Sequence, residues 1–415
     1  MQSDDDAPGP LAAAQAADGA PARTRWPAVA ALSVGVFALV SAEFLPAGTL
    51  TPMAAGLGAT VGGAGQAVTA TAVFGGFAAL STPLIAQRVE RRVILFSMLG
   101  LLLLSDALAA SATNLPTLFV ARALLGLCIG GFWSLAGAVV LPLAAPGAFP
   151  RALSLLFGGV SLATVLAAPA AAFIAGLWGW RVAYWLATAL AAFAGLLQFA
   201  ALPRLGAGSA ASAREFVEVS GRPTVFAALV SLIVLVAGHF AGFTYIRPLL
   251  ERTARFDAPT VSAALLAFGL AGFLGNLLGA ALAERSPRNA ALIGAAAITL
   301  ATAALALAGD NAAVVWGALI VWGAGFAIVP ISYQTWVTTE AADRPEVAGG
   351  LLTAAFQVSI ATGAMGGGFI VDRLGPASVD GAAAFAALAA AAAIILRTRT
   401  PATGPEIASG EAPAE

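Results

Sequence analysis

The sequence contains no lysine, and it has a single cysteine and a single histidine among its 415 residues. Without lysine it cannot form the Gly-Lys-Ser/Thr loop that cradles phosphates in ATP-driven motors. Cys128 alone cannot make an internal disulfide, and together with His239 it supplies too few ligands for a cysteine–histidine metal cluster. These absences argue against an ATP-hydrolysing or metal-dependent enzyme, and we expect no cofactor and no metal ion.

Charged residues are scarce as well. Asp, Glu, Lys and Arg together make up 10% of the chain, whereas 60% is hydrophobic, and the mean hydropathy is +0.91. About a quarter of the residues of an ordinary soluble domain are charged, so this composition indicates an integral membrane protein surrounded by a lipid bilayer. The net charge of −1 says nothing about a partner, but the lack of a dense basic cluster indicates no nucleic-acid partner.

Apolar runs of about 17–25 residues, long enough to cross a bilayer as a helix, are separated by short polar breaks. We predict six of them in the first half of the chain, at about 27–50, 65–86, 93–112, 117–141, 152–176 and 182–202. Six more are predicted in the second half, at about 224–248, 260–282, 289–308, 312–337, 347–371 and 380–396. The sequence thus predicts an all-α membrane protein with twelve transmembrane helices in two pseudo-symmetric six-helix bundles.

The polar segments divide the chain into domains. The longest interior one, 203–223, is predicted to be a cytoplasmic linker between a first bundle, 26–202, and a second bundle, 224–397. The acidic start, 1–25, is predicted to be a disordered cytoplasmic tail, and the end, 398–415, is predicted to be a second cytoplasmic tail. If the amino terminus is cytoplasmic, the inner segments carry fourteen arginines and the outer ones five. Since cytoplasmic loops retain positive charge, both termini are predicted on the cytoplasmic side of a bacterial inner (plasma) membrane.

The two halves resemble each other at an offset of 196 residues. This shift places Val40–Phe44 on Val236–Phe240, and therefore Glu43 on His239. Two six-helix repeats with polar residues near the membrane centre are typical of secondary transporters.

Glu43 is the only ionisable residue in the first apolar run, 27–50. A carboxyl group within a membrane span normally faces a protein interior or a wet cavity, and it is functional by default. Pro46 has no amide hydrogen, so the carbonyl of Ala42 loses its partner in the helix. An acid beside a broken helical bond suggests a proton and ligand site, and we predict that Glu43 gains and loses a proton. The alternative is a glutamate locked in a buried ion pair.

Three further residues are candidates for proton coupling. Arg122 lies about five residues into the fourth run, and because it keeps its charge it needs an anion or carbonyl groups; we expect it to tune the proton affinity of Glu43. Asp106, at a similar depth in the third run, is either a structural partner or a second proton site. His239 could titrate in the working range, since an unperturbed histidine has a pKa of about 6.5, or it could be a fixed hydrogen-bonding group.

The loop between the second and third runs resembles a motif of the major facilitator superfamily. In that family the loop typically reads Gly-x-x-x-Asp-Arg-x-Gly-Arg-Arg. Arg88, Arg91 and Arg92 match it, whereas Pro83, Gln87 and Glu90 depart from it. The resemblance implies a gating loop on the cytoplasmic side, formed by Arg88, Glu90, Arg91 and Arg92.

Other motifs extend the resemblance over nearly the whole chain outside the tails. Arg122 with Gly126 and Gly130 resembles the family's fourth-helix motif, which is associated with proton transfer. A closer similarity, to nucleoside exporters of the drug:proton antiporter group with twelve spans, rests on residues 43–46, 50–53, 126–133, 152–154, 243–248 and 322–336. His239 and Asp106 depart from the residues expected in those exporters, so coupling or substrate can differ.

Aromatic and amide side chains within the runs could bind a flat solute. Rings offer an apolar surface for a base, and intramembrane amides can hydrogen-bond a base edge or ribose hydroxyls, although packing is the commoner role of aromatic residues in membranes. The substrate-binding candidates are the aromatic residues Phe44, Phe132, Trp133, Phe240, Phe243, Tyr245 and Trp336 and the amides Asn276, Gln334 and Gln357.

Taken with the resemblance, these residues predict a proton-coupled efflux transporter for a small neutral solute, foremost a purine ribonucleoside such as inosine or guanosine. One chain is enough to form the pathway, so we expect a monomer. A multidrug or arabinose-type sugar exporter on the same scaffold is one alternative. A membrane receptor that binds a solute without moving it is another.

Overall fold

The computed structural model describes residues 23–86, 88–145, 148–205 and 213–398, and this part of the chain contains helices and no strand. Twelve of these helices are long and apolar enough to cross a membrane, as the sequence predicts. In the first half they are α2 (Trp26–Gly56), α3 (Val61–Ala86), α4 (Arg91–Ala110), α5 (Leu115–Val140), α6 (Phe149–Trp178) and α7 (Trp180–Ala201). In the second half they are α9 (Pro223–Thr244), α11 (Ala258–Arg285), α12 (Pro287–Ala308), α13 (Ala312–Glu340), α14 (Pro345–Leu374) and α15 (Ala377–Thr398).

Within the described residues, three shorter elements lie between these spans. They are the 3₁₀ turn η1 (Leu141–Leu143), α8 (Ala213–Ser220) and α10 (Ile246–Arg252). α8 falls within the predicted linker, and α10 follows α9 directly. Several spans also run past the predicted apolar segments, as α2 does by continuing to Gly56 and α13 by continuing to Glu340. A hydropathy run stops at the last apolar residue, whereas a helix continues while its backbone hydrogen bonds remain.

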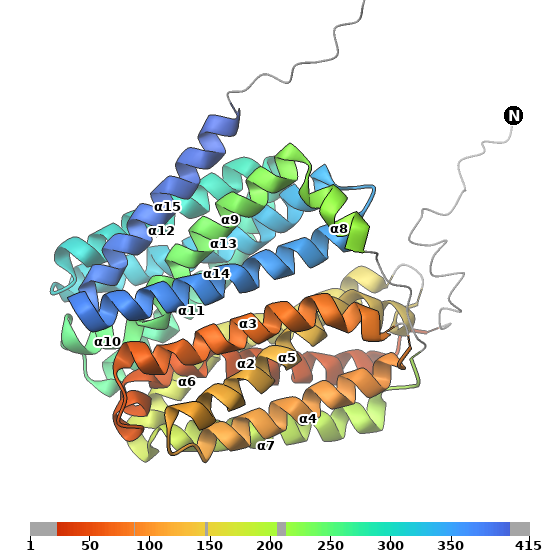
Figure 1. Ribbon diagram of the computed structural model, residues 1–415, viewed down its shortest axis with the longest axis horizontal. Coiled ribbons are helices and arrows are strands. Elements are labelled where there is room, and N and C mark those ends of the chain that lie inside the picture. The colour runs from red at the N-terminus through yellow and green to blue at the C-terminus, as the bar shows by residue number, and fades with distance from the viewer. Residues whose placement is uncertain (1–22, 87, 146–147, 206–212, 399–415) are drawn as a thin grey trace, which may run out of the picture.

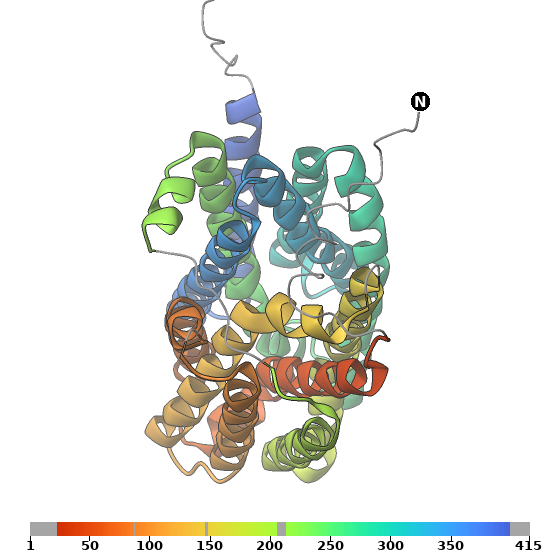
Figure 2. The ribbon, with the colours of Figure 1, turned by 90° about the vertical axis from the view of Figure 1, so that its right-hand side faces the viewer.

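The helices form two bundles that lie against each other (Figures 1 and 2). In the first bundle α3 packs on α5, α2 packs on α6 and α7, and α4 packs on α5 and α7. In the second, α11 and α12 pack on α13, and α9 packs on α14 and α15. Two pairs of helices join the bundles, α3 with α14 and α6 with α11, and α2 also touches α9. These contacts place α2, α3 and α6 of the first bundle and α9, α11 and α14 of the second along the interface, and α5 also touches α14.

Close approach of α3 and α5 depends on glycine. A methyl group on Gly126 would collide with the carbonyl oxygen of Thr71, and one on Gly130 would collide with that of Gly75. Small residues let two membrane helices bring their backbones together, where van der Waals packing drives association. Gly126 and Gly130, which follow Arg122 on α5, thus form part of the contact surface for α3.

Hydrogen bonds join the bundles at the side where α2 ends and α3 begins, which we call the far side; the tail side is where α2 begins and α15 ends. Asp372 on α14 accepts hydrogen bonds from Oγ1 of Thr60, at 2.7 Å, and from the backbone amide of Gly62, at 2.9 Å. Tyr245 donates to the carbonyl of Ala364 over 2.8 Å and to that of Gly62 over 3.5 Å. One carboxylate of the second bundle thereby caps the start of a helix in the first.

Two more cross-bundle hydrogen bonds lie toward the far side. Arg247 on α10 donates to the backbone carbonyl of Gly48 on α2 and also pairs with Glu251 over 2.6 Å. Ser262 on α11 donates to the carbonyl of Pro169 on α6 over 2.8 Å. The far side is therefore held closed in this conformation.

Ion pairs on the tail side lie within the second bundle and its linker. Arg222 pairs with Asp343 through two oxygens, each at 2.6 Å. Arg288 pairs with Glu340 at 2.8 Å. Arg344 pairs with Glu215, which attaches α8 to the start of α14.

Candidate functional site

A cavity lies between the two bundles at the depth of Glu43. The space between its walls is about 440 Å³, which includes a part that is open to the outside. Within this space, the centre of a water molecule can occupy only about 30 Å³. That space holds about two water molecules. Its lining comes from α2, α3 and α5 in the first bundle and from α9 and α14 in the second: Glu43, Phe44, Pro46, Ala47, Val68, Thr71, Ala72, Arg122, Phe240, Phe243, Thr244, Gln357 and Ile360.

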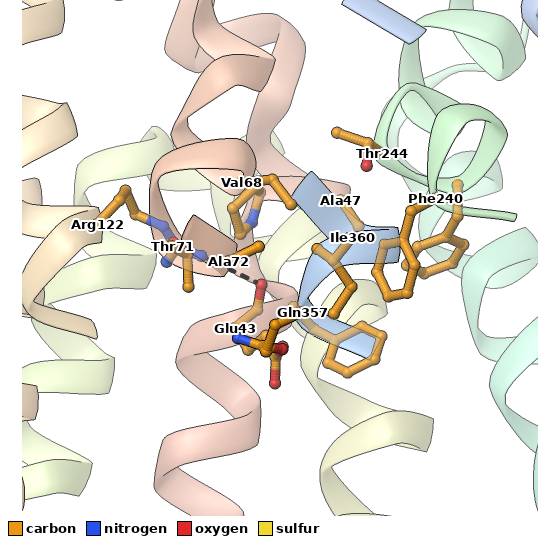
Figure 3. Close-up of a pocket in the computed structure, with 13 residues that line it drawn as sticks. Glu43, Ala47, Val68, Thr71, Ala72, Arg122, Phe240, Thr244, Gln357 and Ile360 are labelled. Carbon is orange, nitrogen blue, oxygen red and sulfur yellow. Dashed lines mark hydrogen bonds between the residues drawn. The ribbon is translucent and has the colours of Figure 1, made fainter. Parts of the chain in front are cut away.

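Arg122 reaches the cavity from α5 and binds the backbone of α2. Its Nη1 donates to the carbonyl of Ala42 over 2.9 Å and its Nη2 donates to the carbonyl of Glu43 over 3.4 Å; Figure 3 marks the second bond. Pro46 stands inside α2 and leaves the Ala42 carbonyl without an amide donor. The guanidinium therefore supplies the hydrogen bond that proline removes, and its side chain is 1% exposed.

Glu43 faces the cavity rather than lipid (Figure 3). Among the described residues it makes no ion pair within 4.0 Å, so the predicted alternative of a glutamate locked in a buried ion pair does not form. Arg122 lies beside it but directs its hydrogen bonds at backbone carbonyls. A carboxyl group with this placement can exchange a proton with whatever occupies the cavity.

Four of the ten predicted substrate-binding residues line this cavity, namely Phe44, Phe240, Phe243 and Gln357. The rings of Phe44 and Phe243 meet edge to face across the two bundles, with their centroids 5.8 Å apart. Gln357 is 5% exposed, and its Nε2 has no hydrogen-bond partner. The cavity thus combines an aromatic wall with one carboxyl group and one unpaired amide donor.

The other predicted aromatic residues lie elsewhere. Phe132 borders a smaller cavity inside the first bundle, and Trp133 stacks on Phe157 with centroids 5.8 Å apart. Tyr245 is buried in the far-side contact with Ala364. Trp336 stacks on Tyr333 at 5.7 Å.

The remaining predicted amides are exposed. Asn276 lies on the surface of α11 among exposed leucines, and Gln334 on α13 donates to Thr338 over 3.3 Å. Neither lines the cavity in this conformation. Two polar residues that the sequence interpretation missed, Thr71 and Thr244, do line it. Threonine recurs throughout the apolar runs, so its presence alone could not distinguish these two.

His239 lies in an aromatic cluster within the second bundle. Nε1 of Trp322 donates to its Nδ1 over 3.0 Å, and its ring stacks on that of Phe326 and on that of Phe243. An Nδ1 that accepts a hydrogen bond carries no proton, so the neutral ring has its proton on Nε2. This geometry favours the fixed hydrogen-bonding role over direct proton coupling.

Asp106 is buried in α4 and lies outside the cavity lining. Neither of its carboxyl oxygens has a hydrogen-bond partner. No ion pair joins it to Arg122 within the part of the chain that the structure describes. Asp106 was predicted to be either a structural partner or a second proton site. The geometry does not support a structural ion pair with Arg122.

Glu90 and Arg92 of the predicted gating loop contact residues at the end of α7 and just after it. Glu90 accepts a hydrogen bond from the backbone amide of Leu205 over 3.1 Å. Arg92 donates to the carbonyl of Phe199 over 3.4 Å and lies over the ring of Phe96. Arg88 is exposed and Arg91 begins α4. Of the predicted motif, Gln87 lies outside the described residues.

Known proteins resemble this chain in sequence and in fold. The family model described as "Major Facilitator Superfamily" matches residues 31–350. The protein named "Purine ribonucleoside efflux pump NepI" from Escherichia coli (strain K12) is 38% identical over 355 residues, which cover 85% of this chain and 89% of that protein. The protein of the same name from Escherichia coli O1:K1 / APEC is 36% identical over 353 residues, with the same coverage.

Solved structures agree on the fold at low sequence identity. A mutant of the nucleoside transporter NupG superposes with a TM-score of 0.72 at 15% identity, covering 89% of this chain and 98% of that one. The D-xylose-proton symporter gives a TM-score of 0.72 at 13% identity, covering 89% and 97%. The extent of the family match and the identity to the efflux pumps identify a membrane transporter and not an enzyme. The chain belongs to the major facilitator superfamily.

Proposed function

We propose that this protein exports purine ribonucleosides, such as inosine and guanosine, in exchange for protons. The nucleoside part of the proposal is supported by the identity of 38% to an efflux pump named for purine ribonucleosides. The single observation that carries the mechanism is the cavity in which Glu43 and Arg122 of the first bundle meet Phe240, Phe243 and Gln357 of the second. A solute bound there contacts both bundles. Protonation of Glu43 therefore changes a binding site to which both bundles contribute.

The cycle requires only that proton and solute stabilise opposite conformations. A charged Glu43 accepts hydrogen bonds from the solute more strongly than a neutral one, so the unprotonated protein binds solute on the cytoplasmic side. After the bundles rock, a proton from outside neutralises Glu43 and weakens the solute's hold. Coupling follows because each ligand has its own differential affinity for the two states.

Arg122 keeps α2 in the shape that this exchange needs. By bonding the carbonyls of Ala42 and Glu43 it fixes the backbone beside the carboxyl group, while its positive charge attracts the anionic form of Glu43. Asp106 stays a candidate for a second proton site, because it is buried with both oxygens unpaired.

The conformation described here suits a state that is closed on the far side. Asp372, Tyr245 and Arg247 bridge the bundles there through Gly62 and Gly48, and space for about two water molecules is too small for a nucleoside. Substrate therefore binds as the bundles separate on the tail side. With both termini in the cytoplasm, the tail side is the cytoplasmic side of the inner membrane, and one chain forms the whole pathway.

Counterflow in proteoliposomes tests the substrate class. Vesicles loaded with unlabelled solute would be diluted into labelled inosine, labelled arabinose or a cationic dye, with and without an imposed pH gradient. We expect inosine to accumulate and to respond to the gradient. Accumulation of arabinose or the dye in place of inosine would favour a sugar or multidrug exporter, and binding without exchange would indicate a receptor.

A further inference from the structure

Gln357 crosses from the second bundle into a notch in the first. A methyl group on Gly75 of α3 would collide with Nε2 of Gln357, and a methyl group on Gly76 would lie at an ordinary 3.6 Å from Cβ of Gln357. Gly126 borders the same notch, with its carbonyl oxygen 3.5 Å from the methyl position on Gly75. The absence of a side chain at Gly75 is thus what admits the amide.

The amide donor in this notch is unsatisfied. Gln357 is 5% exposed, and no hydrogen-bond partner reaches its Nε2. A buried donor without a partner is destabilising, and a ligand that accepts a hydrogen bond from it removes that cost. Glu43, an acceptor when charged, lines the same cavity as Gln357 (Figure 3).

We propose that Glu43 and Gln357 together recognise a lactam edge, in which an N–H lies next to a C=O, and so select 6-oxopurine nucleosides over 6-aminopurine nucleosides. The Glu43 carboxylate accepts from N1–H of the base and Nε2 of Gln357 donates to O6. Inosine and guanosine present this pair. Adenosine presents the reverse, an acceptor at N1 and a donor at N6, which leaves both protein groups unpaired. This inference rests on the proposed function and refines its substrate class.

The same pairing ties recognition to protonation. Arg122 on α5 is the charged residue that borders Glu43 in the cavity; the residues that α3, α9 and α14 add are Val68, Thr71, Ala72, Phe240, Phe243, Thr244, Gln357 and Ile360, none of which changes charge in the working range. Protonation of Glu43 therefore weakens the N1–H contact alone, while the Gln357 contact persists. Release on the outer side then needs the bundles to separate, since Gln357 and Glu43 sit on different bundles.

Competition in counterflow of labelled inosine tests this pairing on the full-length wild-type protein. We expect guanosine to compete about as well as inosine. Adenosine and purine riboside, which both lack the lactam edge, should compete at least about tenfold less well, the effect of losing one charged hydrogen bond. 1-Methylinosine, which keeps O6 and lacks N1–H, should lie between them. Equal competition by adenosine and inosine would overturn the inference and leave nucleoside export standing, whereas no exchange of inosine at all would overturn both.

Substitutions at Gln357 and Gly75 test whether Gln357 is the residue that contacts O6 of the base. Gln357→Leu should weaken inosine and 1-methylinosine about tenfold and leave purine riboside unchanged, and Gly75→Ala should do the same by displacing the amide from its notch. Gly76→Ala is the matched control and should bind inosine as the wild type does. An equal loss for inosine and purine riboside in Gln357→Leu would contradict a role in recognition. If either variant fails to insert in the membrane, the wild-type competition series still decides.

Discussion

Nη1 of Arg122 donates a hydrogen bond over 2.9 Å to the carbonyl of Ala42, the same carbonyl that Pro46 deprives of its helical partner. Two residues 80 positions apart thereby complete one broken turn of α2. Because the guanidinium is occupied by backbone oxygens, it shapes the helix beside Glu43 without locking the carboxyl group in an ion pair.

This relationship predicts that the effects of Arg122 and Pro46 on stability are coupled. Arg122→Met should lower the free energy of unfolding by about 1–3 kcal/mol, since two buried carbonyls lose a charged donor. In a Pro46→Ala background the new amide can donate to the Ala42 carbonyl, so the same change should cost about 1 kcal/mol less. Thermal unfolding of the four proteins in detergent measures this coupling. Strictly additive effects would show that Arg122 does not replace the missing helical bond.

The contact between α3 and α5 predicts a second stability effect. Gly130→Ala should destabilise the protein by about 1–3 kcal/mol, because its methyl group would meet the backbone of Gly75 and Ala79. Gly100→Ala on α4 is the control: nothing lies within 4 Å of the added methyl group, and alanine suits a helix better than glycine by about 0.5–1 kcal/mol. Melting temperatures should move in opposite directions. A tolerated Gly130→Ala would mean that the helices are not in close contact in the membrane.

The far-side contact predicts a shift between conformations. Asp372→Ala removes the acceptor of both Thr60 and the Gly62 amide, so the far-side-closed state should lose population. Electron spin resonance between labels at Ala55 and Leu374, in a Cys128→Ser background, should then show a longer distance component. Asp310→Ala, which removes an exposed acid from the α12–α13 turn on the same side, should leave the distances as they are. An unchanged distribution in Asp372→Ala would show that this contact does not hold the bundles.

The Arg222–Asp343 ion pair predicts a pH range in which its contribution to thermal stability stays constant. Hydrogen bonds from Arg222 lower the pKa of Asp343 to about 2, below the value of about 3.9 for an unperturbed aspartate. A depressed folded-state pKa means that the contribution of the pair is fully present above about pH 4 and is lost as pH falls toward 2. The difference in thermal stability between the wild type and Asp343→Asn should therefore be constant from pH 5 to 8 and narrow below pH 4. A difference that changes between pH 5 and 8 would mean that another group controls this contact.

Much of the site could be predicted from residues that break a local rule. Glu43 is costly in an apolar run and Pro46 is costly in a helix, so both draw attention to one turn of α2. Arg122 was expected beside them because a permanent charge within the membrane needs partners. What the sequence could not tell is that its partners are the carbonyls of Ala42 and Glu43 and not the carboxyl group.

The sequence does not indicate which face of each helix lines the cavity. The spans are apolar on all sides, as lipid contact permits, so no polar–apolar stripe distinguishes the wall of a cavity from the surface of the protein. Residue type alone therefore predicts Asn276 and Gln334 as binding residues, and both lie on exposed faces. Residue type also predicts Gln357, which does line the cavity. Its position depends on Gly75 of the other bundle, which leaves room for the amide, and the sequence around Gln357 does not indicate that contact.

Contacts between residues far apart in the chain could not be predicted from the sequence either. Asp372 and Thr60 stand 312 residues apart, and nothing near either of them indicates the other. The offset of 196 residues pairs Glu43 with His239 along the chain, but the surroundings of the two side chains differ. Glu43 faces a cavity, whereas His239 accepts a hydrogen bond from Trp322 within a cluster of rings.

The most direct test follows the internal pH of proteoliposomes while inosine is exchanged by the wild type and by Glu43→Gln. We predict that the wild type moves protons against inosine, whereas Glu43→Gln binds inosine more weakly but still exchanges labelled inosine for unlabelled inosine, with no movement of protons. Proton movement that persists undiminished in Glu43→Gln would contradict the assignment of Glu43 as the residue that carries the proton.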